Sequence, residues 1–174
     1  MVTPVKSRGK APLTRPFTEA DRLTEAIELL FFAYRDFTSD PDEILTQYDF
    51  GRAHHRVVHF VGRNPGITVA ELLNILRITK QSLARVLKQL IERGFIEQET
   101  GKQDRRQRLL YLTASGRELE ERLAAPQRSR VAAAFAKAGP SAEDAWRTIM
   151  LQLVNDEDRP EVERRIARAA SGQR

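Results

Sequence analysis

The stretch "GITVAELLNILRITKQSLARVLKQLIERGFIEQ", residues 66–98, decides the fold. It begins with "TVAE" (68–71), in which a threonine and a glutamate three residues later can each accept the other's backbone N–H at a helix start. The apolar residues that follow share one face of a short helix: Val69, Leu72, Leu73 and Leu76. Only "RI" (77–78) separates this helix from a second capping residue, Thr79. The spacing therefore predicts two short helices joined by a tight turn.

The second of these helices has an apolar stripe at positions i, i+3, i+4, i+7 and i+8, formed by Leu83, Val86, Leu87, Leu90 and Ile91. Ile78 is placed to pack on Leu83 as a hydrophobic staple, and Gly94 in "RGF" (93–95) is expected to end the helix in a left-handed conformation. The outward positions are then Gln81, Arg85 and Lys88, with Thr79, Lys80 and Ser82 at the exposed N-terminal end. Arg and Gln hydrogen-bond base edges, and a helix N-terminus suits a phosphate.

Two short strands are expected next, "FIEQE" (95–99) and "LLYLT" (109–113), joined by a loop over 101–108. The loop concentrates positive charge in Lys102, Arg105, Arg106 and Arg108. Such a tip can neutralise phosphates and send an arginine into a minor groove. Asp104 has no direct use against DNA, so we expect it to hold one arginine in a bidentate pair. Paired helices followed by a basic hairpin predict a winged helix-turn-helix.

The segment "DRRQRLLYLT" (104–113) is similar to the wing signature of the MarR (multiple antibiotic resistance regulator) family of transcription factors. That signature has an aspartate, an arginine two positions later, an apolar strand and a closing Leu-Thr before a helix. The matching residues are Asp104, Arg106, Leu112 and Thr113. Residues 66–98 resemble the family's paired helices and first wing strand, and "LTASGREL" (112–119) resembles its junction with the next helix.

The resemblance covers about 50–125 and implies double-stranded DNA as the partner. It also implies an obligate homodimer with interleaved terminal helices, a near-palindromic operator, and in many cases a repressor that a small ligand releases. The chain departs from the family pattern in a longer basic N-terminal arm and an extra helix after Asp158.

The flanks predict further helices. Thr18 resembles an N-cap for an amphipathic helix over 19–38 that "SDPDE" (39–43) breaks. A helix over 51–63 precedes the paired helices, and helical spacing returns after Thr113. Ser141 is expected to cap a later helix, and Pro160 to occupy the first position of the last one.

The predicted fold class is mainly α with a small β-hairpin wing: a winged helix-turn-helix plus a helical dimerisation module. The expected divisions are a flexible basic arm over 1–17, a dimerisation module over 18–50 and 114–174, and a DNA-binding domain over 51–113. The apolar residues "LLFFAY" (29–34) and the helix over 141–154 exceed what a domain of about 75 residues can cover, which favours a second copy as their partner.

The helix over 51–63 carries three histidines, His54, His55 and His59. His55 and His59 share one face, as a metal pair would, but no acidic residue or cysteine stands at a matching offset, so we expect no metal. The family's effectors occupy a crevice that this helix would line. The candidate effector contacts are His55, Arg56, His59 and Phe60.

Composition limits the alternatives. The chain has 174 residues, no cysteine and a net charge of +5, which excludes disulfides and cysteine chemistry and mildly favours an acidic partner. No segment is apolar enough for a membrane span, and no secretion signal or catalytic arrangement is present, so we expect a cytoplasmic regulator that needs no cofactor and is not an enzyme. The remaining alternatives are an architectural DNA-binding protein with the same fold and a winged helix that binds protein.

Overall fold

The computed structural model describes residues 17–101 and 104–170, so most of the predicted basic arm (1–17) lies outside the described residues. The chain divides into two units, 1–36 and 37–174, and the division falls within helix α1 (Glu19–Thr46). In the first unit, the Thr18 N–H donates to Asp21 Oδ2 at 2.8 Å and the Asp21 N–H donates to Thr18 Oγ1 at 3.2 Å. The predicted N-cap is thus confirmed, with Asp21 completing a capping box.

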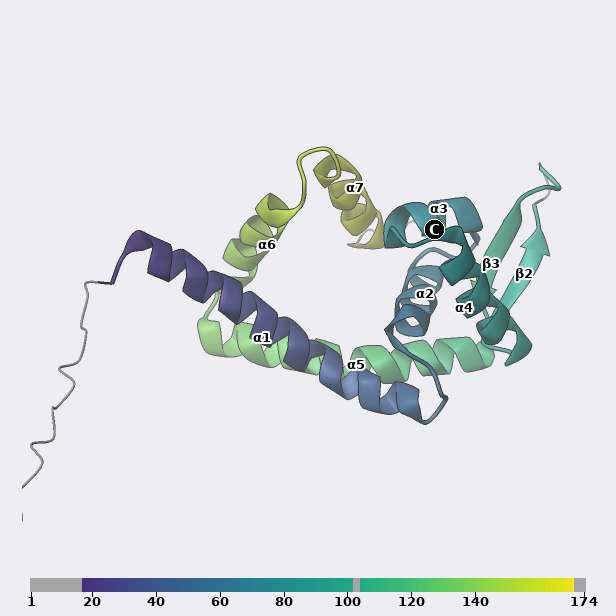
Figure 1. The fold of residues 1–174 in the computed structure, drawn as a ribbon, viewed down its shortest axis with the longest axis horizontal. Helices are drawn as coiled ribbons and strands as arrows, with labels where there is room; N and C mark the ends of the chain where they lie inside the picture. Colours follow the sequence, from purple (N-terminus) through teal and green to yellow (C-terminus); the bar gives the residue numbers. More distant parts are fainter. Residues whose placement is uncertain (1–16, 102–103, 171–174) are drawn as a thin grey trace, which may run out of the picture. The chain divides into compact units, whose positions relative to one another are not determined.

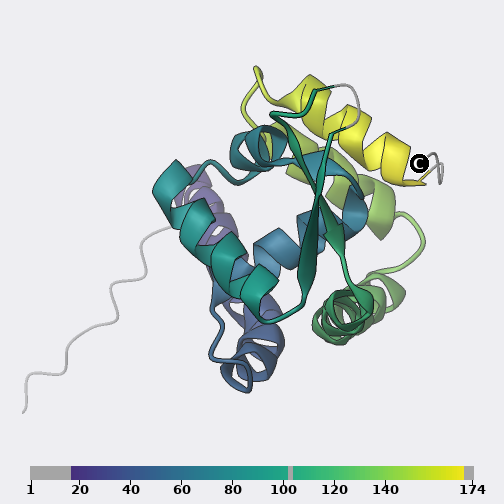
Figure 2. The same ribbon diagram turned by 90° about the vertical axis from the view of Figure 1, so that its right-hand side faces the viewer.

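The second unit is mainly helical with one small sheet (Figure 1). Its elements after α1 are α2 (Arg52–Arg63), β1 (Ile67–Thr68), α3 (Val69–Leu76), α4 (Lys80–Glu92), β2 (Ile96–Thr100), β3 (Arg108–Leu112), α5 (Ala114–Ala138), α6 (Ala142–Leu153) and α7 (Arg159–Ala170). The strands are antiparallel in the order β1-β3-β2. Figure 2 shows the β2–β3 hairpin beside α4, which contacts β2. This is the predicted winged helix-turn-helix.

The local signals at the paired helices are confirmed. Thr68 Oγ1 accepts from the Glu71 N–H at 3.2 Å, and Glu71 Oε2 accepts from the Thr68 N–H at 2.9 Å. Thr79 caps α4, and Gly94 after α4 has a φ of +74°. The stripe residues Leu83, Val86, Leu87 and Leu90 are buried, while Ile91 is partly buried against the same core. That core also takes residues from α2, the sheet and the start of α5.

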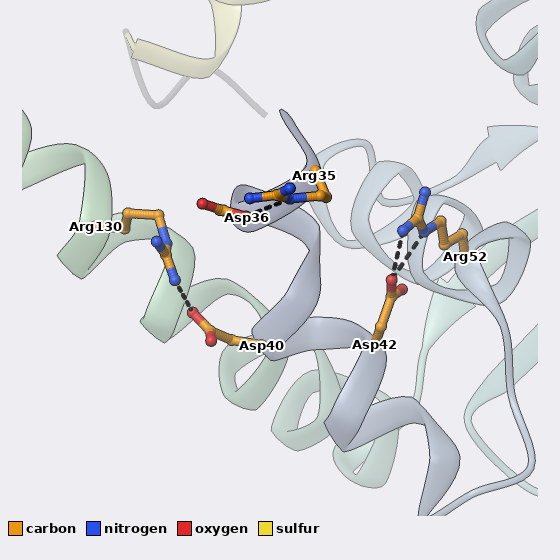
Figure 3. Close-up of polar contacts among 6 residues, drawn as sticks. All are labelled: Arg35, Asp36, Asp40, Asp42, Arg52 and Arg130. Carbon is orange, nitrogen blue, oxygen red and sulfur yellow. Dashed lines mark hydrogen bonds and ion pairs between the residues drawn. The ribbon is translucent and has the colours of Figure 1, made fainter. Parts of the chain in front are cut away.

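Helix α1 does not end at "SDPDE", and this prediction was wrong. Pro41 lies inside the helix and cannot donate to the carbonyl of Phe37, but the Gln127 side-chain amide of α5 donates to that carbonyl at 3.3 Å. Two ion pairs flank the proline (Figure 3): Asp40 with Arg130 of α5 at 2.9 Å, and Asp42 with Arg52 of α2 at 2.7 Å. Tertiary contacts thus satisfy the group that the proline leaves without its helical donor.

The sheet has a third strand that the sequence analysis missed. In β1, Ile67 pairs with Leu110 and Thr68 pairs with Leu109. The N–H of Gly66 also donates to the carbonyl of Leu110 at 2.9 Å. Two residues are too few to show a strand's alternation, and Thr68 is also the cap of α3, so the helical signal hid the strand.

The junction from wing to α5 depends on a close approach. Thr113 Oγ1 accepts from the Gly116 N–H at 3.0 Å and donates to the carbonyl of Gly94 at 2.6 Å. The N–H of Thr113 donates to the carbonyl of Phe95 at 3.1 Å. A Cβ on Gly116 would lie 2.0 Å from that same carbonyl oxygen. Only glycine at this position lets α5 start directly against the α4–β2 turn.

Two expectations for the C-terminal helices need correction. Ser141 does precede α6, but its φ of −87° and ψ of −5° are helical, and its hydroxyl makes no capping hydrogen bond. Helix α7 begins at Arg159, one residue before the predicted position at Pro160. The Arg159 guanidinium, which donates to the carbonyls of Leu151 and Val154, closes the turn between α6 and α7. None of the helices in the described ranges has the length and apolar character that crossing a membrane requires.

Candidate nucleic-acid interface

Helix α4 presents one polar face because its other face is fixed in the core. Leu83, Leu87 and Leu90 are at most 4% exposed. The side chains at Gln81, Arg85 and Lys88 are consequently exposed, as the stripe predicts. Arg85 lies one helical turn after Gln81 on the same face, so the two present adjacent donor groups to one partner surface.

The N-terminal end of α4 combines caps with charge. Thr79 Oγ1 accepts from the Ser82 N–H at 3.1 Å and donates to the Ser82 hydroxyl at 2.8 Å. Both hydroxyls are thus engaged in local capping, while the side chain of Lys80 is exposed. Lys88 pairs with Glu92 at 3.7 Å across one turn, an exposed contact worth little. Among the predicted residues of this helix, Gln81, Arg85 and Lys80 are the ones that lack such a role in the fold.

The tip of the wing is exposed and positively charged. Arg105, Arg106 and Arg108 are all exposed, and Arg108 donates to the Thr100 hydroxyl at 2.7 Å across the hairpin. Lys102, the fourth predicted cation, lies outside the described residues. Arg105 and Arg106 are at the turn itself, where the backbone closes with the Gln107 N–H donating to the Asp104 carbonyl at 3.0 Å.

Asp104 does not hold an arginine side chain in the described part of the wing, and this expectation was wrong. Its Oδ1 accepts from the backbone N–H of Arg106 at 2.8 Å. An aspartate commonly bonds the backbone two residues on, because the ring formed is short and needs no long side chain to be ordered. The carboxylate therefore fixes the turn on which Arg106 stands and leaves the Arg106 guanidinium exposed.

The four candidate effector residues lie on α2 with different surroundings. His59 Nδ1 lies 3.4 Å from Glu120 Oε1 of α5, and its ring stands edge-on to Phe60 at 5.2 Å. The hydrogen bond from His59 lowers the pKa of Glu120. Burial, and then the nearby His59, lower the pKa of His55, which is half-buried, whereas Arg56 is exposed.

The structure brings Glu120 to the histidines although no acidic residue stands at a matching offset in the sequence. This carboxylate comes from 61 residues further along the chain than His59, so residue spacing within α2 could not predict it. In the described part of the chain, however, no three His, Cys, Asp or Glu side chains are grouped as metal ligands.

His54 is a residue whose role the sequence analysis missed. It is 9% exposed, and Nδ1 accepts from the Gly51 N–H at 3.1 Å while Nε2 lies 2.7 Å from Gln89 Oε1 of α4. The available signal was its position three residues after the N-cap residue Gly51, where a Glu or Gln often reaches back to cap the helix. The contact with Gln89 had no sequence signal.

The comparisons with known proteins agree on one family. The sequence model of the MarR family matches residues 48–107. The chain is 49% identical over 139 residues to PetP of Rhodobacter capsulatus, an HTH-type transcriptional regulator, across 80% of this chain and 84% of PetP. These names point to a transcription regulator and not to an enzyme.

Solved structures share the fold. The crystal structure of a MarR family transcription regulator superposes with a TM-score of 0.64 at 22% identity, covering 78% of this chain and 89% of that one. Apo MarR from E. coli gives a TM-score of 0.55 at 22% identity over 72% of this chain and 93% of that one. The chain thus belongs to the MarR family of DNA-binding transcriptional regulators.

Proposed function

We infer that the protein is a homodimeric, sequence-specific regulator that binds a pseudo-palindromic operator and acts as a ligand-responsive repressor in the cytoplasm. The observation that carries this proposal is the pairing of two different polar surfaces on one fold. Helix α4 exposes Gln81 and Arg85, which suit base edges, and the wing exposes Arg105 and Arg106, which suit phosphates and a minor groove.

The proposed contacts divide by role. On α4, Gln81 and Arg85 read bases, and Lys80 with the helix N-terminus at Thr79 and Ser82 holds a phosphate. Lys88 adds a cation near the backbone. In the wing, Arg106 enters the minor groove, Asp104 fixes its turn, and the remaining cations Lys102, Arg105 and Arg108 neutralise phosphates.

A second copy is proposed as the partner of the apolar surfaces. In the first unit, Leu23, Ile27 and Phe31 follow one another at helical spacing and are 58%, 69% and 63% exposed. In the second unit, α6 has no buried residue and exposes Trp146, Ile149 and Leu153. Apolar helix faces of this kind usually mark an interface. We assign both to the dimerisation module, over 18–50 and 114–174, and the intervening 51–113 to DNA binding.

The proposed effector is an amphipathic anion such as an aromatic carboxylate, held on α2. Phe60 offers an apolar contact and Arg56 an exposed cation. Because Glu120 already faces His59, the anion would depend on Arg56 and His55 for its polar contacts. The ligand needs only to favour the arrangement that does not match the operator, since its effect equals its differential affinity for the two states.

The test is sedimentation combined with DNA titration against bulk genomic competitor. A two-fold dimer places its recognition helices in successive major grooves, so half-sites lie about 10 base pairs apart, centre to centre. We expect a dimer at micromolar concentration, operator binding that survives the competitor, and loss of binding when about five base pairs are inserted between half-sites. Binding equally shared with bulk DNA would instead identify an architectural protein.

The effector has its own test. Titration of benzoate into the protein–operator complex should release the DNA, and Arg56→Ala should weaken this release without changing operator affinity in the absence of benzoate. A complex that benzoate and related aromatic carboxylates leave intact would remove this ligand class.

A further inference from the structure

His54 is a buried polar residue that the proposed function does not use. Thr38 and His54 are the buried polar side chains recorded in the described part of the chain. His54 lies in the first turn of α2, and its ring stacks on Phe50, with ring centres 4.4 Å apart and an interplanar angle of 10°. A stacked, buried imidazole has one orientation, so its two nitrogens have fixed partners.

Those partners determine which nitrogen carries the proton. The Gly51 N–H can only donate, so Nδ1, 3.1 Å away, must accept. Nε2 therefore carries the hydrogen of the neutral ring and donates to Gln89 Oε1 at 2.7 Å. His54 thus joins the backbone at the start of α2 to a side chain of α4.

Arg93, at the C-terminal end of α4, makes a second polar contact, to the loop between α1 and α2. This C-cap residue of α4 donates to the Tyr48 carbonyl, and its guanidinium lies 4.6 Å from the centre of the Phe50 ring. Gln89 and Arg93 are four residues apart and so lie on one edge of the helix. The first turn of α2 and the loop before it therefore contact this edge at two successive turns.

These contacts matter because the buried face of α4 packs on the core through apolar side chains. The packing of Leu83, Leu87 and Leu90 sets the outward face of α4, but the hydrophobic effect itself has no preferred direction, so a directional bond can refine the rotation of the helix. A hydrogen bond prefers a donor angle above about 150° and weakens steeply below about 120°. Gln81 and Arg85 lie two turns and one turn before Gln89, on the same face. The bond at Gln89 can therefore adjust the direction that the apolar stripe sets for them.

We propose that His54 is a positioning residue for DNA recognition, which acts through Gln89 to fix the rotation of α4 at which Gln81 and Arg85 face the bases. This inference rests on the proposed function of α4. Phosphate contacts tolerate small displacements, whereas base contacts are geometrically strict. Loss of the His54–Gln89 bond therefore lowers the preference for operator over bulk DNA and leaves non-specific binding unchanged.

The experiment is a double-mutant cycle on the full-length protein, using an operator selected from random duplex DNA and fluorescence anisotropy at fixed salt. His54→Asn keeps an amide oxygen near the position of Nδ1 but is too short to reach Gln89. His54→Gln places an N–H near the position of Nε2. Gln89→Met removes the acceptor at similar length. Gln98→Met, at an exposed position of β2 outside the proposed contacts with DNA and with the second copy, is the matched control.

We expect His54→Asn and Gln89→Met each to reduce operator preference about two- to tenfold, and the double variant to be no worse than either, as for residues that act through one bond. His54→Gln and Gln98→Met should retain the operator preference. Non-specific affinity and its salt dependence should stay near wild type in all of them, whereas Tm should fall in His54→Asn because a buried hydrogen bond and the ring stack are lost.

Additive losses in the cycle, or parallel losses of Tm and of both kinds of binding, would overturn the proposal by reducing His54 to a structural role. Arg85→Ala separates this failure from failure of the proposed function. If Arg85→Ala changes base preference and His54→Asn does not, only the positioning role is lost. If neither variant changes it, α4 is not the reading helix and both proposals fall.

Discussion

Replacing Gly116 with alanine tests how α5 is seated on the winged domain. The new Cβ would lie 2.0 Å from the Phe95 carbonyl oxygen, and contacts below 3.0 Å are essentially never found. The helix or the carbonyl must then move by about 1 Å, and the same carbonyl accepts the Thr113 N–H at 3.1 Å. Overpacking costs about 1–3 kcal/mol and a weakened hydrogen bond about 1 kcal/mol, so we expect about 2–4 kcal/mol in all.

For a chain of this size, that loss lowers Tm by on the order of 10 °C. The assay is thermal unfolding followed by circular dichroism at one protein concentration, since a dimer's Tm depends on concentration. Gly94 is the matched comparison, because it has open space around it but a φ of +74°. Asparagine tolerates that conformation, so Gly94→Asn should be more stable than Gly94→Ala. At position 116, where space is lacking, the asparagine variant should be less stable than the alanine variant. A Gly116→Ala variant as stable as wild type would refute the close approach.

Three other changes test separate parts of the account. Arg106→Ala should weaken operator binding by about 1–3 kcal/mol in a gel-shift titration at fixed salt, with Tm unchanged; equal affinity would remove Arg106 from the interface. Hydrogen bonds from the Thr68 N–H and hydroxyl hold the pKa of Glu71 below its ordinary value. The capping box therefore contributes its full stability above the ordinary pKa of a glutamate, and that contribution is lost as the pH falls through the lower folded-state pKa. In urea unfolding, Glu71→Gln should therefore be less stable than wild type near pH 7, with the gap narrowing in acid, and a gap independent of pH would contradict this. Ile27→Asp should shift sedimentation towards monomer, whereas an unchanged dimer would place the interface elsewhere.

The winged domain could be predicted from the sequence because its signals are local. The Thr68–Glu71 box and the Leu83–Leu90 stripe each lie within a few turns of chain, and the structure forms both as expected. The stripe also determines which side chains of α4 are exposed, so the outward direction of Gln81 and Arg85 followed from spacing alone.

The failures share a different cause, which is dependence on distant residues. Pro41 lies inside α1, where Gln127, 90 residues from Phe37, donates to the carbonyl that the proline leaves without its helical donor. Glu120 reaches His59, and Gln89 reaches His54, from elements that no helical period connects to α2. Asp104 is a different case, because both of its candidate partners are local. Its carboxylate accepts a hydrogen bond from the Arg106 backbone N–H and does not pair with an arginine guanidinium in the described part of the wing.

The central claim, that α4 reads bases, is tested most directly by selecting binding sites from random duplex DNA with the wild-type protein and with a Gln81→Ala, Arg85→Ala double variant. We expect the wild-type protein to enrich a pseudo-palindrome whose half-sites lie about 10 base pairs apart. The double variant should still bind DNA but should lose preference at one or two positions in each half-site. The same motif from both proteins, or no motif from the wild type, would contradict the account.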